Sequence, residues 1–163
     1  MKHVTSSIRT AIFSTLFALG ACACTPTFAT PKGFVELDEH GTYDQRATTP
    51  DGLVLAGREI ENDPEGDLDF WSRAVENQMR LRGGYALLGK RKVKTASGHE
   101  GEQLRFGHDE GNKPHLYTVA LFVTRGTIWK DGTIYVVEAG GPRELVEKNT
   151  DAINWAISNA RVD

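Results

Sequence analysis

The sequence predicts an α+β domain in which a mostly antiparallel β-sheet is covered by helices on both faces, and three observations support this fold class. Leu116–Val123 and Ile134–Val137 are apolar at nearly every position, as expected of strands buried on both sides. A stripe of apolar residues at helical spacing lies near the end of the chain. Short turns rich in Gly, Asn, Asp and Pro separate the strands and favour hairpins. The expected order of elements is β-β-α-β-β-β-β-α.

The first 21 residues have the layout of a secretory signal peptide. Lys2 and Arg9 precede the short, mostly apolar run Ala11–Ala21. This run is shorter than the about 20 apolar residues that span a bilayer. Its end, Leu19-Gly20-Ala21-Cys22, resembles the lipobox of bacterial lipoproteins. In that family the cysteine is lipidated and the peptide is cut before it, which implies a lipid such as palmitate on Cys22 and a membrane-anchored protein that faces the periplasm.

The two residues that follow refine this expectation. In some envelope systems Asp directly after the lipidated cysteine retains a lipoprotein at the inner membrane; here that residue is Ala23, which favours the outer membrane. Cys24 is the only other cysteine, and a lipobox shifted to it would place Ala21 where Leu19 stands. We therefore expect Cys24 to be an unpaired residue of the tether, with an intermolecular disulfide as the alternative.

Length and charge limit the remaining possibilities. After a signal peptide at 1–21 and a Pro-containing linker at 22–33, residues 34–163 are enough for one domain with its own core. Removal of residues 1–21 takes away Lys2 and Arg9, so the formal net charge changes from −3 to −5. This balance argues against nucleic-acid binding, which needs a basic surface.

Local signals then place the elements in order. Phe34–Asp38 is a short first strand, and Tyr43–Thr49 and Leu53–Ile60 form a hairpin around the turn Pro50-Asp51-Gly52. Asp67 is the expected N-cap of a helix that ends at Gly83-Gly84. Four strands follow, at Tyr85–Ala96, Glu102–His108, Leu116–Thr124 and Thr133–Ala139, and a helix begins at Pro142, where a missing N–H costs nothing.

This succession of segments resembles the PsbP-like superfamily between about Phe34 and Val162. The residues that carry the resemblance are GHEGEQLRF, YTVALFV, IYVVEAGG and the closing amphipathic helix. Members of the superfamily include extrinsic proteins of photosystem II, a Ran-binding nuclear import factor and small bacterial lipoproteins. The resemblance implies an α/β/α sandwich that binds or assembles other proteins and has no shared active site.

The candidate chemical sites in the chain do not match known templates. His108 and His115 flank a predicted turn and could meet across a hairpin beside Asp109 and Glu110, but exposed hairpin histidines are usually ordinary polar surface. The alternating acids of NDPEGDLD do not have the spacing of a calcium-binding EF-hand loop. No nucleophile elbow, P-loop or dinucleotide fingerprint occurs. We therefore expect no catalytic residue, cofactor or metal.

The charge distribution suggests a partner surface. Residues 36–69 carry a net charge of −9, whereas residues 73–94 carry +6. Either these segments complement each other within the fold, or the basic one meets an acidic partner. Trp129 lies in a probable loop between two core strands, and exposed tryptophans are frequent binding hot spots. Lys90, Arg91, Lys92 and Trp129 are therefore the candidate contacts for a protein partner in the envelope.

Two functions remain open from the sequence. One is a non-catalytic binding or assembly factor, which should have a closed core and a flat charged face. The other is a small-molecule or metal-binding domain with weak or no enzymatic activity. This second type should show a deep pocket lined by converging polar groups.

The lipid anchor can be tested directly. Replacement Cys22→Ala should abolish incorporation of labelled palmitate, because the acylated residue is lost, whereas Cys24→Ala should leave labelling unchanged. Metabolic labelling of the full-length chain measures both. Labelling that depends on Cys24 instead would show that the cleavage site is misplaced by two residues.

Overall fold

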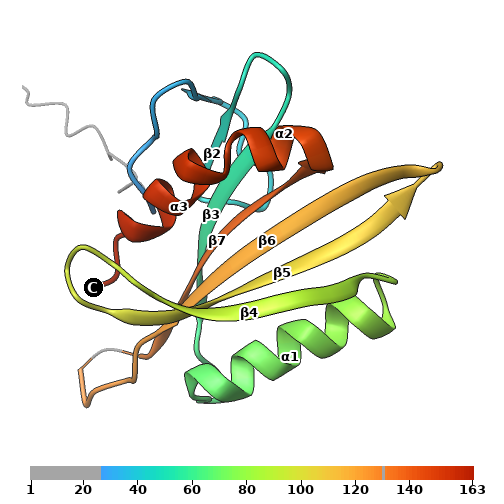
Figure 1. Cartoon of the computed structure of the whole chain (residues 1–163). Coiled ribbons are helices and arrows are strands. Elements are labelled where there is room, and N and C mark those ends of the chain that lie inside the picture. Colours follow the sequence, from blue (N-terminus) through green and yellow to red (C-terminus); the bar gives the residue numbers. More distant parts are fainter. Residues whose placement is uncertain (1–26, 130) are drawn as a thin grey trace, which may run out of the picture.

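The structure, a computed structural model, describes residues 27–129 and 131–163; the predicted signal peptide, Cys22 and Cys24 lie outside the described residues. Seven strands form a single sheet in the order β1-β2-β3-β7-β6-β5-β4, and every neighbouring pair is antiparallel (Figure 1). The predicted α+β class with a mostly antiparallel sheet is confirmed. The elements are β1 (Val35–Glu36), β2 (Gln45–Thr48), β3 (Val54–Glu61), α1 (Leu68–Leu81), β4 (Ala86–Lys94), β5 (Glu100–Glu110), β6 (Lys113–Val123), β7 (Thr133–Pro142), α2 (Arg143–Lys148) and α3 (Thr150–Ser158).

The order of elements differs from the predicted one at both ends. Three strands precede α1, whereas the expected order counts two; the additional strand is β1, which lies within the predicted short strand Phe34–Asp38 and pairs with β2. The single closing helix is divided into α2 and α3 at Asn149, whose backbone leaves the helical region with φ −104° and ψ 14°. The Asn149 side chain donates to the carbonyl of Leu145 at 2.8 Å, and such local side-chain bonds compete with helix continuation.

The central strands β6 and β7 are buried on both faces, as their apolar sequences predict. Alternate residues of a strand point to opposite faces. Val119 and Leu121 of β6 therefore join the cluster beneath α1, whereas Ala120 and Phe122 join the cluster beneath α2 and α3. Figure 1 shows α1 on one side of the sheet and α2 with α3 on the other.

The local turn and cap signals also hold. Gly52 takes φ +90° in the turn between β2 and β3, and its N–H bonds the carbonyl of Thr49 at 2.9 Å. Asp67 caps α1, because its Oδ1 accepts the N–H of Phe70 at 2.8 Å. Asp69 in the first turn further favours the helix at this position, because its negative charge lies at the positive end of the helix dipole.

Part of the segment expected to be a linker packs on the domain. Phe28 is fully buried in the cluster beneath α3 and forms a bridge with Ala160. Gln45 fixes this segment, since its Oε1 accepts the Phe28 N–H at 3.1 Å. Gly57 makes the approach possible, because a Cβ at that position would lie 1.9 Å from Oγ1 of Thr27. The packed part of the chain therefore reaches back at least to residue 27.

Buried Asn62 joins α1 to one end of the sheet. Its Oδ1 accepts from the Gly66 N–H at 2.9 Å and from Nε1 of Trp71 at 2.7 Å. Its Nδ2 donates to the carbonyls of Gly66 and Thr124 at 3.0 and 3.3 Å. One amide thus holds the segment before α1, the first turn of α1 and the end of β6, and it fixes where α1 crosses the sheet.

Candidate functional site

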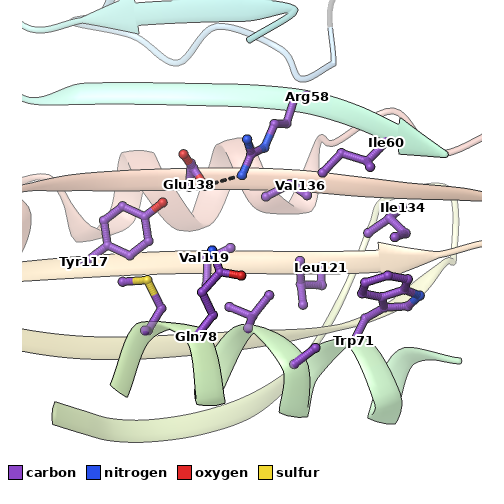
Figure 2. A pocket seen from close by; sticks show the side chains of 13 residues that line it. Arg58, Ile60, Trp71, Gln78, Tyr117, Val119, Leu121, Ile134, Val136 and Glu138 are labelled. Carbon is purple, nitrogen blue, oxygen red and sulfur yellow. Dashed lines mark ion pairs between the residues drawn. The ribbon is translucent and has the colours of Figure 1, made fainter. Parts of the chain in front are cut away.

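Helix α1 covers only part of its face of the sheet. It packs mainly on β4, β5 and β6, so the α1 side of β7 and β3 is less covered. A cavity of about 230 Å³ lies along this boundary (Figure 2). We call it the α1 groove. Its walls are mostly apolar, and several polar side chains lie together at one end. The residues that line it are Arg58, Ile60, Trp71, Ala74, Val75, Gln78, Met79, Tyr117, Val119, Leu121, Ile134, Val136 and Glu138.

Strand register assembles the polar end of the groove. Arg46 of β2 pairs with Ala56, Ala56 pairs with Glu138 of β7, and Glu138 pairs with Val119 of β6. Residues paired in this way point to the same face of a sheet. Val119 lies beneath α1, so Arg46 and Glu138 share the α1 face. Arg58 lies on the same face, two residues beyond Ala56 on β3.

Glu138 is a buried carboxylate in an otherwise apolar strand. Only 5% of its surface is exposed. The Tyr43 hydroxyl donates to its Oε1, and Nη2 of Arg58 lies 3.9 Å from its Oε2. The Arg58 guanidinium also lies 5.4 Å from the centre of the Tyr43 ring. A buried charge needs such partners, because desolvation would otherwise cost several kcal/mol, on the order of the penalty per ion in proteins.

The two tyrosines near Glu138 are harder to ionise than usual. Burial raises the pKa of Tyr117 far above its ordinary range, and the negative charge of Glu138 raises it further. Burial and the hydrogen bond to Glu138 also raise the pKa of Tyr43. Both phenols are therefore neutral hydrogen-bond donors at physiological pH, beside a carboxylate that can accept from them.

A second cavity, of about 210 Å³, adjoins the α1 groove at Glu138 and Tyr117. Arg46, Tyr43 and Ala56 also line it. Within residues 27–129 and 131–163, the buried Nε atoms of Arg46 and Arg58 have no hydrogen-bond partner. The polar end of the groove therefore contains more donors than the protein itself satisfies.

The sequence analysis did not identify this site. Its one available signal was Glu138, the only charged residue within the apolar run IYVVEAGG. A carboxylate in a strand buried on both faces needs a special environment, so that pattern could have drawn attention to β7. Arg46 and Arg58 carry no comparable signal, because charged residues in a hairpin are common on surfaces.

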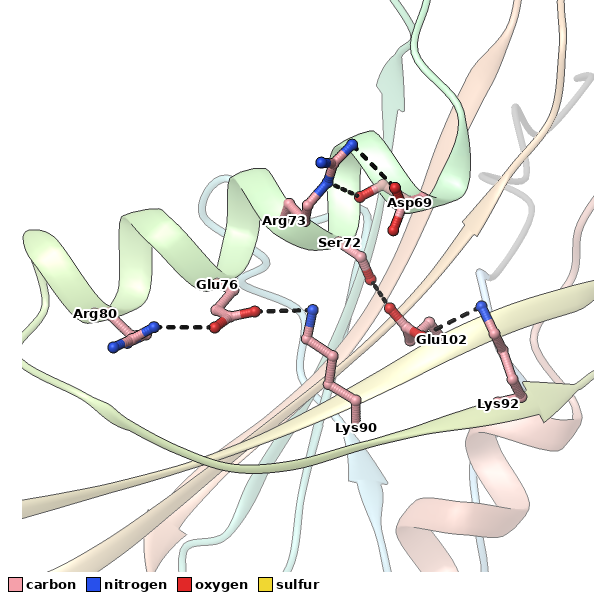
Figure 3. A network of polar contacts seen from close by, with 8 residues as sticks. All are labelled: Asp69, Ser72, Arg73, Glu76, Arg80, Lys90, Lys92 and Glu102. Carbon is pink, nitrogen blue, oxygen red and sulfur yellow. Dashed lines mark hydrogen bonds and ion pairs between the residues drawn. The ribbon is translucent and has the colours of Figure 1, made fainter.

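The basic residues predicted to contact a partner lie on β4, at one edge of the sheet. Lys90 bonds Glu76 of α1 at 2.8 Å, and Lys92 lies 3.3 Å from Glu102 of β5 (Figure 3). The buried Ser72 hydroxyl also donates to Glu102.

Arg91 points to the other face of the sheet, where its guanidinium donates to Gln103 and to Asn154 of α3. Each of the three cations thus has partners within the fold. The partners of Lys90, Arg91 and Lys92 do not come from the acidic segment 36–69, so these three cations do not pair with that segment within the fold.

These pairings stabilise the ionised carboxylates. The hydrogen bond from Lys90 lowers the pKa of Glu76 below its ordinary value. Burial alone would raise the pKa of Glu102, but the hydrogen bonds from Ser72 and Lys92 outweigh it, so that pKa is also lowered. Together with Asn62, these contacts fix α1 over β4 and β5.

Trp129 lies in the loop between β6 and β7 with 90% of its surface exposed, next to Ile128 at 88%. The adjacent Ile128 was not recognised from the sequence, although two neighbouring large apolar residues between glycines are an equally clear feature. Within the described part of the chain, no hydrogen bond or ion pair joins Trp129 to Lys90, Arg91 or Lys92. Trp129 lies in the loop between β6 and β7, whereas the three basic residues lie on β4.

The histidines meet as predicted, since His108 of β5 pairs with His115 of β6. Nε2 of His115 lies 3.5 Å from a carboxylate oxygen of Glu110. Across residues 27–129 and 131–163, however, no three side chains of His, Cys, Asp or Glu gather closely enough to hold a metal ion. Ser97 contacts His99 at 3.1 Å, but this pair lies in an exposed turn two residues apart.

No helix in the described part of the chain is long and apolar enough to cross a bilayer. No family model matches the sequence, and no curated protein matches it.

Solved structures do show similarity. LpqN of Mycobacterium tuberculosis, described as involved in cell envelope biogenesis, aligns with a TM-score of 0.64 and 12% identity over 79% of this chain and 78% of LpqN. PA94 of Pseudomonas aeruginosa, a protein of unknown function, aligns with a TM-score of 0.52 and 11% identity over 80% and 81%. The Ran-binding protein Mog1p of Saccharomyces cerevisiae gives 0.47 and 16% over 80% and 82%. The first two similarities support the expected PsbP-like fold and, at such low identities, show the fold alone.

The tyrosines at Glu138 predict the behaviour of the domain at high pH. Because the pKa values of Tyr43 and Tyr117 are raised only in the folded state, their contribution to stability is complete below about pH 10 and is lost as the pH rises through the folded-state values. Urea unfolding between about pH 8 and 11 should show a steep loss of stability, and Tyr117→Phe should make it shallower. The same slope in both proteins would contradict this account.

Proposed function

We propose that this protein is a lipid-anchored component of the bacterial cell envelope that acts as a non-catalytic binding or assembly factor. The anchor is the lipid on Cys22, and Ala23 directs the protein to the outer membrane rather than the inner one. The domain faces the periplasm, and its ligand or partner binds in the α1 groove. The similarity of fold to an envelope protein, LpqN, is compatible with this proposal.

The observation that carries the proposal is the incomplete cover of the sheet by α1. A fold that only needed to bury its core would place the helix over the centre of the apolar face. Here Val136 and Ile134 of β7 and Ile60 of β3 instead line an open groove beside α1. Ligand sites in proteins are typically mostly apolar clefts with a few placed polar groups, and this groove has that composition.

The chemistry at hand supports binding rather than catalysis. Buried Ser72 donates to the Glu102 carboxylate, which also pairs with Lys92, and not to a histidine; the Ser97–His99 contact belongs to a surface turn. Glu138 accepts from the Tyr43 hydroxyl and faces the Arg58 guanidinium, so both of its oxygens have partners within the site. A groove of this kind can hold a ligand in place without transforming it.

The alternative, a small-molecule-binding domain, would use the same groove. The cavity of about 230 Å³ lies below the 300–1,000 Å³ that is usual for drug-sized ligands. Its size suits a single apolar group better than a complete cofactor. A partner that inserts one side chain therefore fits the groove better than a large free ligand.

Occupancy of the groove can be tested with Nile red, a neutral apolar dye. We expect the wild-type domain to bind the dye at one site with increased fluorescence, and Ala74→Phe to abolish binding because Ala74 lines the groove. Asn77→Phe, on the exposed side of the same helix, is the matched control and should bind normally. Equal dye binding by the two variants would remove the support for the groove as the binding site.

The exposed loop provides a second, independent contact in this proposal. Trp129→Ala should leave the folded state intact, because the side chain is 90% exposed, and should weaken photocrosslinking to an envelope partner severalfold. Trp155→Ala, a partly exposed tryptophan on α3, is the control. Replacing Lys90, Arg91 and Lys92 by Gln should weaken capture modestly, and less in high salt. Unchanged capture by folded Trp129→Ala would show that partners bind elsewhere.

A further inference from the structure

The α1 groove also indicates the chemical nature of its ligand; this inference rests on the proposed function. Arg46 and Arg58 lie on adjacent strands on the same face of the sheet: Arg46 shares a cross-strand row with Glu138 through Ala56, and Arg58 lies in the next row, opposite Val136. Arg58 lines the α1 groove, Arg46 lines the adjoining cavity, and Glu138 lines both. Together these three side chains carry one net positive charge. The open, polar end of the groove is therefore complementary to a single negative charge.

Hydrogen bonding leads to the same conclusion. Arg58 reaches Glu138 only at 3.9 Å, and Nη1 of Arg46 reaches the carbonyl of Glu39 at 3.4 Å. The buried Nε of each arginine lacks a partner among the described residues. Glu138 accepts from Tyr43 through Oε1, and its Oε2 lies 3.9 Å from Nη2 of Arg58, so it does not bond either Nε donor. The missing component is an acceptor, and a carboxylate matches a guanidinium in both charge and geometry.

The apolar part of the groove lies directly beside these donors. Val136 is the cross-strand partner of Arg58, and the Cβ atoms of such pairs are about 4.5–5.5 Å apart. Val136, Ile134 and Trp71 then line the cavity beneath α1. A ligand that uses both parts must carry its carboxylate within a few bonds of its apolar group. The C-terminal residue of a polypeptide meets this requirement, because its side chain and its carboxylate share one Cα.

We propose that the α1 groove captures the C-terminal residue of a polypeptide partner, with an apolar side chain between α1 and β7 and the α-carboxylate between Arg46 and Arg58. The cavity of about 230 Å³ has room for one large side chain. Capture of a chain end through its carboxylate is an established mode of peptide recognition, although other proteins use backbone N–H groups for it. Here two arginines supply the donors.

The test uses the folded protein and dye-labelled peptides of one sequence that ends in leucine. We expect the peptide with a free carboxylate to bind at least tenfold more tightly than its C-terminal amide, by fluorescence anisotropy. Arg46→Gln and Arg58→Gln should each remove most of this preference. Arg105→Gln, an exposed arginine of β5, is the control and should retain it. Ala74→Phe should weaken both peptides, because it fills the apolar part.

Each other outcome has a distinct meaning. Equal binding of the acid and the amide would overturn the role of the carboxylate but leave the groove as a binding site. Equally tight binding of an amidated peptide with an internal Leu-Asp would overturn the preference for a chain end, and equally tight binding of free octanoate would overturn the polypeptide ligand. If Nile red binds but no peptide does, this inference fails alone; if neither binds, the proposed function of the groove fails with it.

Discussion

The burial of β6 and β7 on both faces is the constraint on which the rest of this structure depends. Because alternate residues enter opposite clusters, each strand must be apolar at consecutive positions, and each face needs a helical cover. Leu121 and Phe122 illustrate the rule, since they are neighbours in sequence and belong to different clusters. Any charged residue within these strands must be given partners by the surrounding fold. Glu138 is such a charged residue, and the polar end of the α1 groove is built around it.

The position of α1 follows from polar contacts as much as from packing. Asn62 fixes its first turn through the Trp71 indole, and Ser72 and Glu76 bind residues of β5 and β4. The Ser72 and Glu76 contacts hold the side of the helix that faces β5 and β4. The helix cannot shift towards the centre of the sheet without leaving buried polar groups unpaired, which costs about 1–3 kcal/mol for each group. The groove is therefore a stable feature of the fold rather than a gap that the helix could close.

Sequence patterns predicted the elements more successfully than the site. The turn at Gly52, the cap at Asp67 and the apolar runs of β6 and β7 are local signals, so they could be read one segment at a time. Arg46 and Arg58 lie near Glu138 only because of the register between β2, β3 and β7, which no short pattern specifies. The partners of Lys90 and Arg91 likewise come from helices distant in sequence. Phe28 was missed because nearby prolines indicate a linker, whereas its burial depends on the space above Gly57.

The packing of Phe28 determines how far the domain can move from a membrane. If a lipid on Cys22 anchors the protein, as proposed above, five peptide units separate the anchor from Thr27, the first residue that the structure describes, and they span at most about 18 Å when fully extended. A free linker to Gly33 would roughly double that reach. A domain anchored in this way would sample only a thin layer above the lipid headgroups. Partners that present a chain end within this layer meet it at a high local concentration, whereas those deeper in the periplasm lie beyond its radius.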